Sequence, residues 1–291
     1  MHLTLPLGAV LLFLVTLMFL VGLEASAREV GATLTHYGLL ARALVLNVVI
    51  VPFIAVLVVL WVGLPPVIAI GILLMAAAPG VPFLPRMAAT AKGNLAFAVG
   101  LMIVLQVVSF VTTPITLRLI LPPDAAARVP VLRAVVTLVA FQLLPLALGM
   151  TVQQVSTPLA RRIAGPVKAL SMLGLLGTIV LFIGPHLDVL AKVAGGGALL
   201  SMLLLVVVAW PLGRRLGGAD EGIGKTLALG TSLRNVGLCL LIATRDFPET
   251  GVATVVGAYF LIQAIANFGY SKYLGRAPRP AVAGAPVAGP R

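Results

Sequence analysis

The sequence predicts an all-α, multi-pass membrane protein, and three observations support this fold class. The chain has 291 residues, of which 60% are hydrophobic and only 10% are charged. Its mean hydropathy is +1.16. A soluble domain could not cover so much apolar side chain with so little polar surface. The third observation is a series of long charge-free stretches, since about 20 apolar residues cross the roughly 30 Å hydrocarbon core as a helix.

We expect about nine membrane spans in a single transmembrane domain that covers residues 1–273. The spans are predicted at residues 3–23, 38–62, 65–90, 94–120, 129–153, 164–184, 194–213, 222–244 and 250–273. The first stretch lacks a basic n-region and a small-residue cleavage site, so we interpret it as a span and not as a signal peptide. Residues 274–291 are rich in Ala, Pro, Gly and Arg and predict a disordered basic tail.

The distribution of Lys and Arg predicts the orientation, because cytoplasmic loops carry an excess of basic residues. One side holds most of them, including the pairs Arg161-Arg162 and Arg214-Arg215, whereas the other side holds few, such as Arg118. We therefore expect an N-terminus outside and a cytoplasmic C-terminus. This agrees with an odd number of spans and with a location in a bacterial inner membrane.

Composition also argues against several functions. The single cysteine, Cys239, excludes a disulfide framework, and the three histidines show no metal-ligand spacing. Topology explains the net charge of +12 better than nucleic-acid binding does, because the basic residues are scattered between apolar spans. No pairing of a nucleophile with a base is visible. We expect no cofactor, no metal and no enzyme activity, and the sequence leaves the oligomeric state open.

The third predicted span is interrupted. Four helix-breaking residues, Pro79, Gly80, Pro82 and Pro85, occur within one short segment. Proline removes a backbone donor and clashes with the carbonyl one turn earlier, so a regular helix cannot continue here. The freed polar groups are tolerated at membrane depth only where they line a protein cavity.

The eighth predicted span, at residues 222–244, is interrupted as well. Gly230 and Gly237 flank a polar segment, which consists of Thr231, Ser232, Arg234 and Asn235. Two interrupted spans five apart imply inverted repeats, and such pairs mark binding sites near the membrane midplane in transporters. The alternative is that the glycines and prolines only kink helices or allow close packing.

With these motifs the chain resembles the bile acid:sodium symporter family over about residues 10–273. The matching pieces are Met18-Phe19 with Gly22-Leu23, Pro79-Gly80, Ala91-Lys92-Gly93-Asn94, and Asn235 with Gly237-Leu238. The resemblance implies a panel domain, a core domain and two discontinuous helices that cross at the midplane. It also implies secondary transport by alternating access.

The chain departs from the family where sodium-using members hold their ions. Gly230 and Arg234 stand at the positions of a Glu and a Gln, and Asn235 is kept. The other ligand positions fall on Asn47, Leu84, Pro85, Ala98 and Met102. Because alkyl groups and proline offer no side-chain oxygen and an arginine repels cations, we expect transport without sodium.

We expect the substrate to be an amphipathic organic anion, such as a carboxylate or sulfonate, attracted by fixed guanidinium charge. The candidate substrate-binding residues are Arg234, Asn235, Ser232, Thr231, Asn47, Arg86, Pro79, Gly80 and Gln263. Alternatively, Arg234 is a structural plug, Arg86 snorkels to the interface, and Gln263 only bonds a neighbouring helix. The competing function is a membrane receptor or sensor on a degenerate carrier fold, because disuse would also remove the ion ligands.

Overall fold

A computed structural model describes residues 4–80, 82–183, 187–195, 197–248 and 250–276. In these residues the regular structure is helical, and the β-type pairing is limited to an isolated antiparallel bridge between Pro79 and Arg234. The helices are α1 (Thr4–Glu24), α2 (Ala27–Leu34), α3 (Tyr37–Val45), η1 (Leu46–Ile50), α4 (Val51–Val62), α5 (Pro66–Ala77), α6 (Leu84–Thr90), α7 (Leu95–Ile120), α8 (Pro123–Ala127), α9 (Val131–Leu138), η2 (Val139–Leu143), α10 (Leu144–Val155), α11 (Thr157–Ile183), α12 (Leu187–Ala194), α13 (Gly197–Leu216), α14 (Glu221–Ser232), α15 (Val236–Asp246) and α16 (Val252–Arg276).

The multi-pass prediction is confirmed. Among the described residues, six helical stretches are long and apolar enough to cross a membrane. They are Leu7–Glu24, Tyr37–Val62, Leu95–Ile120, Val131–Val155, Gly197–Leu216 and Val252–Arg276. The predicted spans at 65–90 and 222–244 fall on two pairs of shorter helices, α5 with α6 and α14 with α15.

Three of the predicted boundaries lie at or next to residues that the structure does not describe. Residue 3 of the first span and residue 184 of the sixth lie outside it. The helix α16 continues through Arg276, so the first three residues of the predicted tail are helical. The rest of that tail, 277–291, lies outside the described residues.

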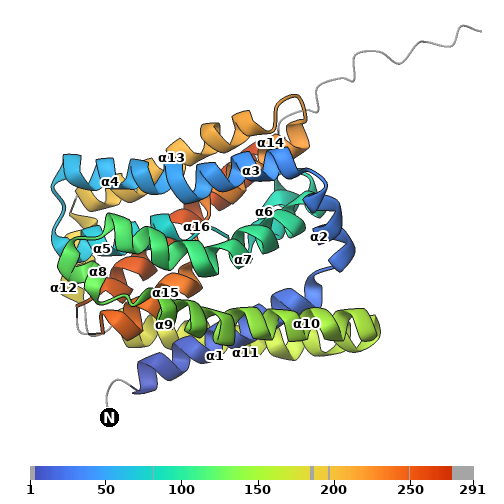
Figure 1. Ribbon diagram of the computed structural model, residues 1–291, viewed down its shortest axis with the longest axis horizontal. Coiled ribbons are helices and arrows are strands. Elements are labelled where there is room, and N and C mark those ends of the chain that lie inside the picture. The colour runs from blue at the N-terminus through green and yellow to red at the C-terminus, as the bar shows by residue number, and fades with distance from the viewer. Residues whose placement is uncertain (1–3, 81, 184–186, 196, 249, 277–291) are drawn as a thin grey trace, which may run out of the picture.

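One group of helices, which we call the α1 layer, consists of α1, α9, η2, α10 and α11. Figure 1 shows α1, α10 and α11 side by side along one edge of the molecule. The backbones touch closely at Gly22 of α1 and Gly149 of α10. A Cβ atom at Gly22 would lie 2.3 Å from the Leu146 carbonyl oxygen, and one at Gly149 would lie 2.3 Å from the Phe19 carbonyl oxygen. Small residues allow this approach, as is typical of membrane helix pairs.

The other helices form the main body, in which α7 lies close to α5, α6 and α14. On the side of α7 that faces α5, the Thr113 hydroxyl donates to the Ala77 carbonyl at 2.8 Å. Two short π-helices, η1 and η2, each come directly before a helix with a proline in its first turn, Pro52 or Pro145. Proline crowds the preceding carbonyl, which explains the wider turn at these places.

The chain between α5 and α6 depends on Gly80. Its φ of +91° lies in the left-handed region that L side chains rarely adopt. A Cβ there would also lie 2.7 Å from the backbone nitrogen of Gln106 on α7. The local sequence therefore fixes both where α5 stops and how closely the connection approaches α7.

Candidate functional site

The two helix interruptions meet inside the main body. The backbones of Pro79 and Arg234 pair in the antiparallel bridge, and the Asn235 amide donates to the Ala78 carbonyl at 2.8 Å. We call residues 78–80 and 231–235 the crossover. Here α5 and α14 end and α15 begins, so the free backbone groups of three helix termini gather in one place.

Arg234 is the charged group at the centre of the crossover, and its side chain is only 1% exposed. One terminal guanidinium nitrogen donates to the Asn47 and Ala76 carbonyl oxygens, both at 3.3 Å. The other donates to the Thr231 carbonyl oxygen. Ala76 and Thr231 lie in the last turns of α5 and α14, where carbonyls lack helical partners and carry partial negative charge.

No carboxylate pairs with Arg234 among the described residues. Its charge is therefore stabilised by carbonyl dipoles, which the planar guanidinium fork can contact in several directions at once. Arginine hydrogen-bonded to helix ends in this way ties together three segments that are distant in the sequence. These are η1, the end of α5 and the end of α14.

Amide side chains complete the polar centre. The Gln263 side chain on α16 accepts from the Arg234 amide at 2.9 Å and donates to the Arg234 carbonyl at 3.0 Å. Ser232 donates to the Asn267 side chain, which also accepts from Trp210 Nε1 at 3.0 Å. The Asn235 side chain accepts from the Leu238 amide at 3.1 Å and thereby caps α15.

The crossover brings together most of the residues predicted from the sequence. The Asn47 side-chain amide donates to the Thr231 hydroxyl at 3.5 Å. The Gln263 side chain hydrogen-bonds both the amide and the carbonyl of Arg234. The full set gathered here is Asn47, Pro79, Gly80, Thr231, Ser232, Arg234, Asn235 and Gln263. Two buried amide atoms, Oδ1 of Asn47 and Nδ2 of Asn235, have no hydrogen-bond partner within the described part of the chain.

The oxygen atoms at the crossover are the groups that a sodium ion would need. A hard cation needs several oxygen ligands. Three backbone carbonyls here already accept from Arg234, whereas Oδ1 of Asn47 has no partner within the described part of the chain. Gly230 faces apolar atoms, since a Cβ there would lie 3.1 Å from Leu101 Cδ2 and 3.2 Å from Leu84 Cδ2. The guanidinium of Arg234 places one positive charge at this point.

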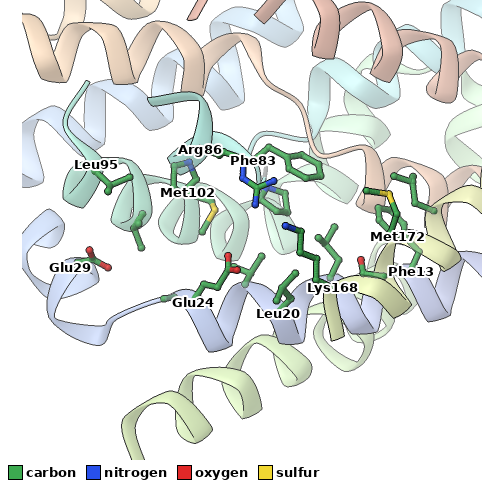
Figure 2. Close-up of a pocket in the computed structure, with 18 residues that line it drawn as sticks. Phe13, Leu20, Glu24, Glu29, Phe83, Arg86, Leu95, Met102, Lys168 and Met172 are labelled. Carbon is green, nitrogen blue, oxygen red and sulfur yellow. The ribbon is translucent and has the colours of Figure 1, made fainter. Parts of the chain in front are cut away.

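Arg86 is separate from this centre. It is exposed and lies on α6, on the wall of a cavity of about 310 Å³ between α1 and α11 on one side and α6 and α7 on the other. Figure 2 shows this cavity with Arg86 and Lys168 reaching into it. Much of its lining is apolar, including Phe13, Leu17 and Met172.

Lys168 is not among the site residues predicted from the sequence. The available signal was its place inside the predicted sixth span, with Val167 and Leu170 as neighbours. The helix α11 begins earlier than that span, at Thr157, so Lys168 lies well inside a helix.

A polar contact joins the two groups of helices away from the cavity. Arg245 at the end of α15 donates to the Thr137 hydroxyl on α9 at 2.8 Å. The same guanidinium pairs with Asp246, whose side chain is only 4% exposed. This ion pair therefore lies at a contact between the main body and the α1 layer.

Comparison with known protein families gives a match over much of the chain. A model of the Sodium Bile acid symporter family matches residues 11–193, which extend from α1 into α12. The matched region includes all the helices that line the cavity and the first interruption of the crossover. A search of curated proteins finds no match.

Proposed function

The chain belongs to the sodium bile acid symporter family, and from this premise we propose that it is a secondary transporter for an amphipathic organic anion, not coupled to sodium. The family, together with six helices able to cross a membrane, makes it a multi-pass membrane protein with a transporter's architecture. The substrate class and the mode of coupling are the proposed steps.

The proposed architecture has nine spans. In it, α5 with α6 and α14 with α15 each form one discontinuous span, and the two lie in inverted repeats. The α1 layer corresponds to a panel, and the main body corresponds to a core that moves against it. The N-terminus lies outside and the C-terminus lies inside a bacterial inner membrane. The bridge from Pro79 to Arg234 supports the meeting of two interrupted spans at one point.

The buried guanidinium of Arg234 carries the proposal of sodium independence. It donates to three backbone carbonyls at a position where a mobile cation would otherwise hold the helix ends together. A tethered cation performs this task permanently and needs no ion from solution. In this proposal Arg234 organises the crossover, together with Asn47, Thr231, Ser232, Asn235 and Gln263.

The cavity supports an organic anion as the substrate. Its volume of about 310 Å³ suits a small organic molecule. Its apolar walls suit a hydrophobic body, and the basic side chains of Arg86 and Lys168 suit a carboxylate or sulfonate. Because the cavity separates the α1 layer from the main body, movement between them would open it to one side or the other.

Counterflow in proteoliposomes tests the proposed function. We expect the purified protein to exchange labelled organic anions, drawn from a panel of carboxylates and sulfonates, across the vesicle membrane. The rate should be the same in sodium, potassium or N-methylglucamine buffers. A requirement for sodium would contradict the tethered-cation proposal. Binding of an anion without counterflow would instead favour the receptor alternative.

A further inference from the structure

Trp210 lies on α13, at the edge of the main body that Figure 1 shows opposite the α1 layer. It precedes Arg214 and Arg215 by about one turn, and its side chain is partly exposed. Its ring stacks on Tyr270 of α16, with ring centroids 4.0 Å apart and planes inclined by 10°. Aromatic side chains near the basic end of a span are typical of the membrane–water interface.

The indole N–H of Trp210 points away from the position that this location suggests. Tryptophans at the membrane surface place their rings among apolar groups and offer the N–H to water or head groups. Here Nε1 donates inward at 3.0 Å, to Oδ1 of Asn267 on α16, and the Asn267 side chain is buried. The bond therefore stabilises a buried amide and not a contact with the membrane surface.

This bond fixes the orientation of the Asn267 amide. Because an indole N–H can only donate, the atom that faces Trp210 must be the amide oxygen. The amide nitrogen then donates to the backbone carbonyl of Gln263 at 2.8 Å. The same amide oxygen accepts from the hydroxyl of Ser232, which is the last residue of α14. Trp210 thus determines which atom of Asn267 meets the crossover.

The end of α14 is held by two neighbouring helices. On α16, Gln263 and Asn267 are one turn apart, and they bond Arg234 and Ser232 respectively. On α13, Trp210 secures Asn267. The described lining of the cavity includes no residue of α13. Removing the indole N–H would therefore loosen the support of the crossover without changing the cavity wall.

We propose that Trp210 is a positioning residue of the crossover, because it orients Asn267 for Ser232 and so holds the end of α14 in place. A crossover that is held less firmly spends less time in the arrangement that the transport cycle needs. Since the cavity wall is the same in both arrangements, bound substrate does not restore the lost population. The maximal rate should then fall while KM stays constant. This consequence rests on the proposed function, whereas the role in orienting Asn267 does not.

The indole N–H provides the first measurement. The chain has two tryptophans, Trp61 and Trp210, so protein labelled at the indole nitrogen gives two NMR signals in detergent, which Trp61→Phe assigns. Asn267→Leu should move the Trp210 proton signal upfield, because its acceptor is lost. Ser232→Ala should also shift this signal, because the indole N–H then no longer shares the amide oxygen with a second donor.

Ser201→Ala is the matched control. Ser201 is a buried serine on the same helix as Trp210, but its hydroxyl donates to the Gly197 carbonyl of its own helix at 2.7 Å. Its replacement should leave the Trp210 signal where it is. A merely structural contact of Trp210 would not distinguish Ser232→Ala from this control.

Counterflow of labelled naphthoate, an apolar carboxylate, gives the second measurement. Trp210→Phe keeps an aromatic ring for stacking on Tyr270 but removes the donor. It should lower the maximal rate about fivefold, which corresponds to about 1 kcal/mol for one neutral hydrogen bond, with KM unchanged. Adding Ser232→Ala to Trp210→Phe should lower the rate by less than the product of the two single effects, because both act through Asn267.

Either of two results would overturn the inference. One is a Trp210 signal that stays in place in both Asn267→Leu and Ser232→Ala, and the other is a wild-type counterflow rate in Trp210→Phe. The NMR measurement leaves Trp210 in the protein, so it decides the inference even if Trp210→Phe does not fold. Failure of the proposed function looks different, since wild-type protein without naphthoate counterflow would still show the expected NMR shifts.

Discussion

Replacing Arg234 by Gln tests the tethered cation directly. The substitution removes a guanidinium that donates to the carbonyls of Asn47, Ala76 and Thr231. Three charge-assisted hydrogen bonds contribute about 1.5–3 kcal/mol each, hence about 5–9 kcal/mol in total. The cost of burying the charge, several kcal/mol, is released at the same time. We therefore expect a net destabilisation of about 2–4 kcal/mol.

The assay is thermal unfolding of the purified protein in detergent, in sodium and in potassium buffers. A loss of this size should lower Tm by about 3–7 °C for a chain of this length. Wild-type Tm should be the same in both buffers, because the crossover needs no ion. Arg162→Gln, on the exposed surface of α11, is the matched control and should leave Tm unchanged. An unchanged Tm in Arg234→Gln, or a wild type stabilised by sodium, would refute the reasoning.

Four further predictions concern the fold and the transport cycle. Gly80→Ala should lower the free energy of unfolding by about 1–3 kcal/mol, because φ is +91° and a Cβ atom would collide with the backbone of α7. Thermal unfolding measures this loss of stability. Gln263→Leu leaves the buried amide and carbonyl of Arg234 without partners and should cost about 2 kcal/mol by the same assay. Thr137→Val removes the hydrogen bond from Arg245, so counterflow rates should change while the stability loss stays near 1 kcal/mol; equal rates would speak against a coupling role. An inside-negative potential set with valinomycin should slow uptake of a monoanion and leave uptake of a neutral probe unaffected.

The sequence carries the location of the crossover because the signals there are local. Proline and glycine interrupt helices wherever they occur, and an arginine inside an apolar span needs polar partners. These rules lead to Pro79, Gly80 and Arg234 without knowledge of the fold. They do not identify the partners, because the carbonyls of Asn47 and Ala76 look like any others in the sequence.

Arg86 and Lys168 show why the cavity is harder to predict. Arg86 is selected because it lies in an interrupted span, whereas Lys168 is one of many basic residues that topology alone explains. Their common feature is that they face one cavity from different groups of helices, and this depends on how α6 packs relative to α11. Packing of distant segments is a property of the whole fold, so sequence spacing does not encode it in a readable form.

In the proposed function the two arginines selected from the sequence have different roles, and this difference constrains the energetics of transport. A sodium ion that binds and leaves changes the charge of a carrier during its cycle, whereas Arg234 is covalently fixed and hydrogen-bonded at the crossover. If no other ion is coupled, the charge that crosses the membrane is then the charge of the substrate alone. For a monoanion, a potential of about 100 mV corresponds to about 2.3 kcal/mol, and an inside-negative potential opposes entry. Inward accumulation would therefore need a second driving force, while efflux or exchange against another anion would not.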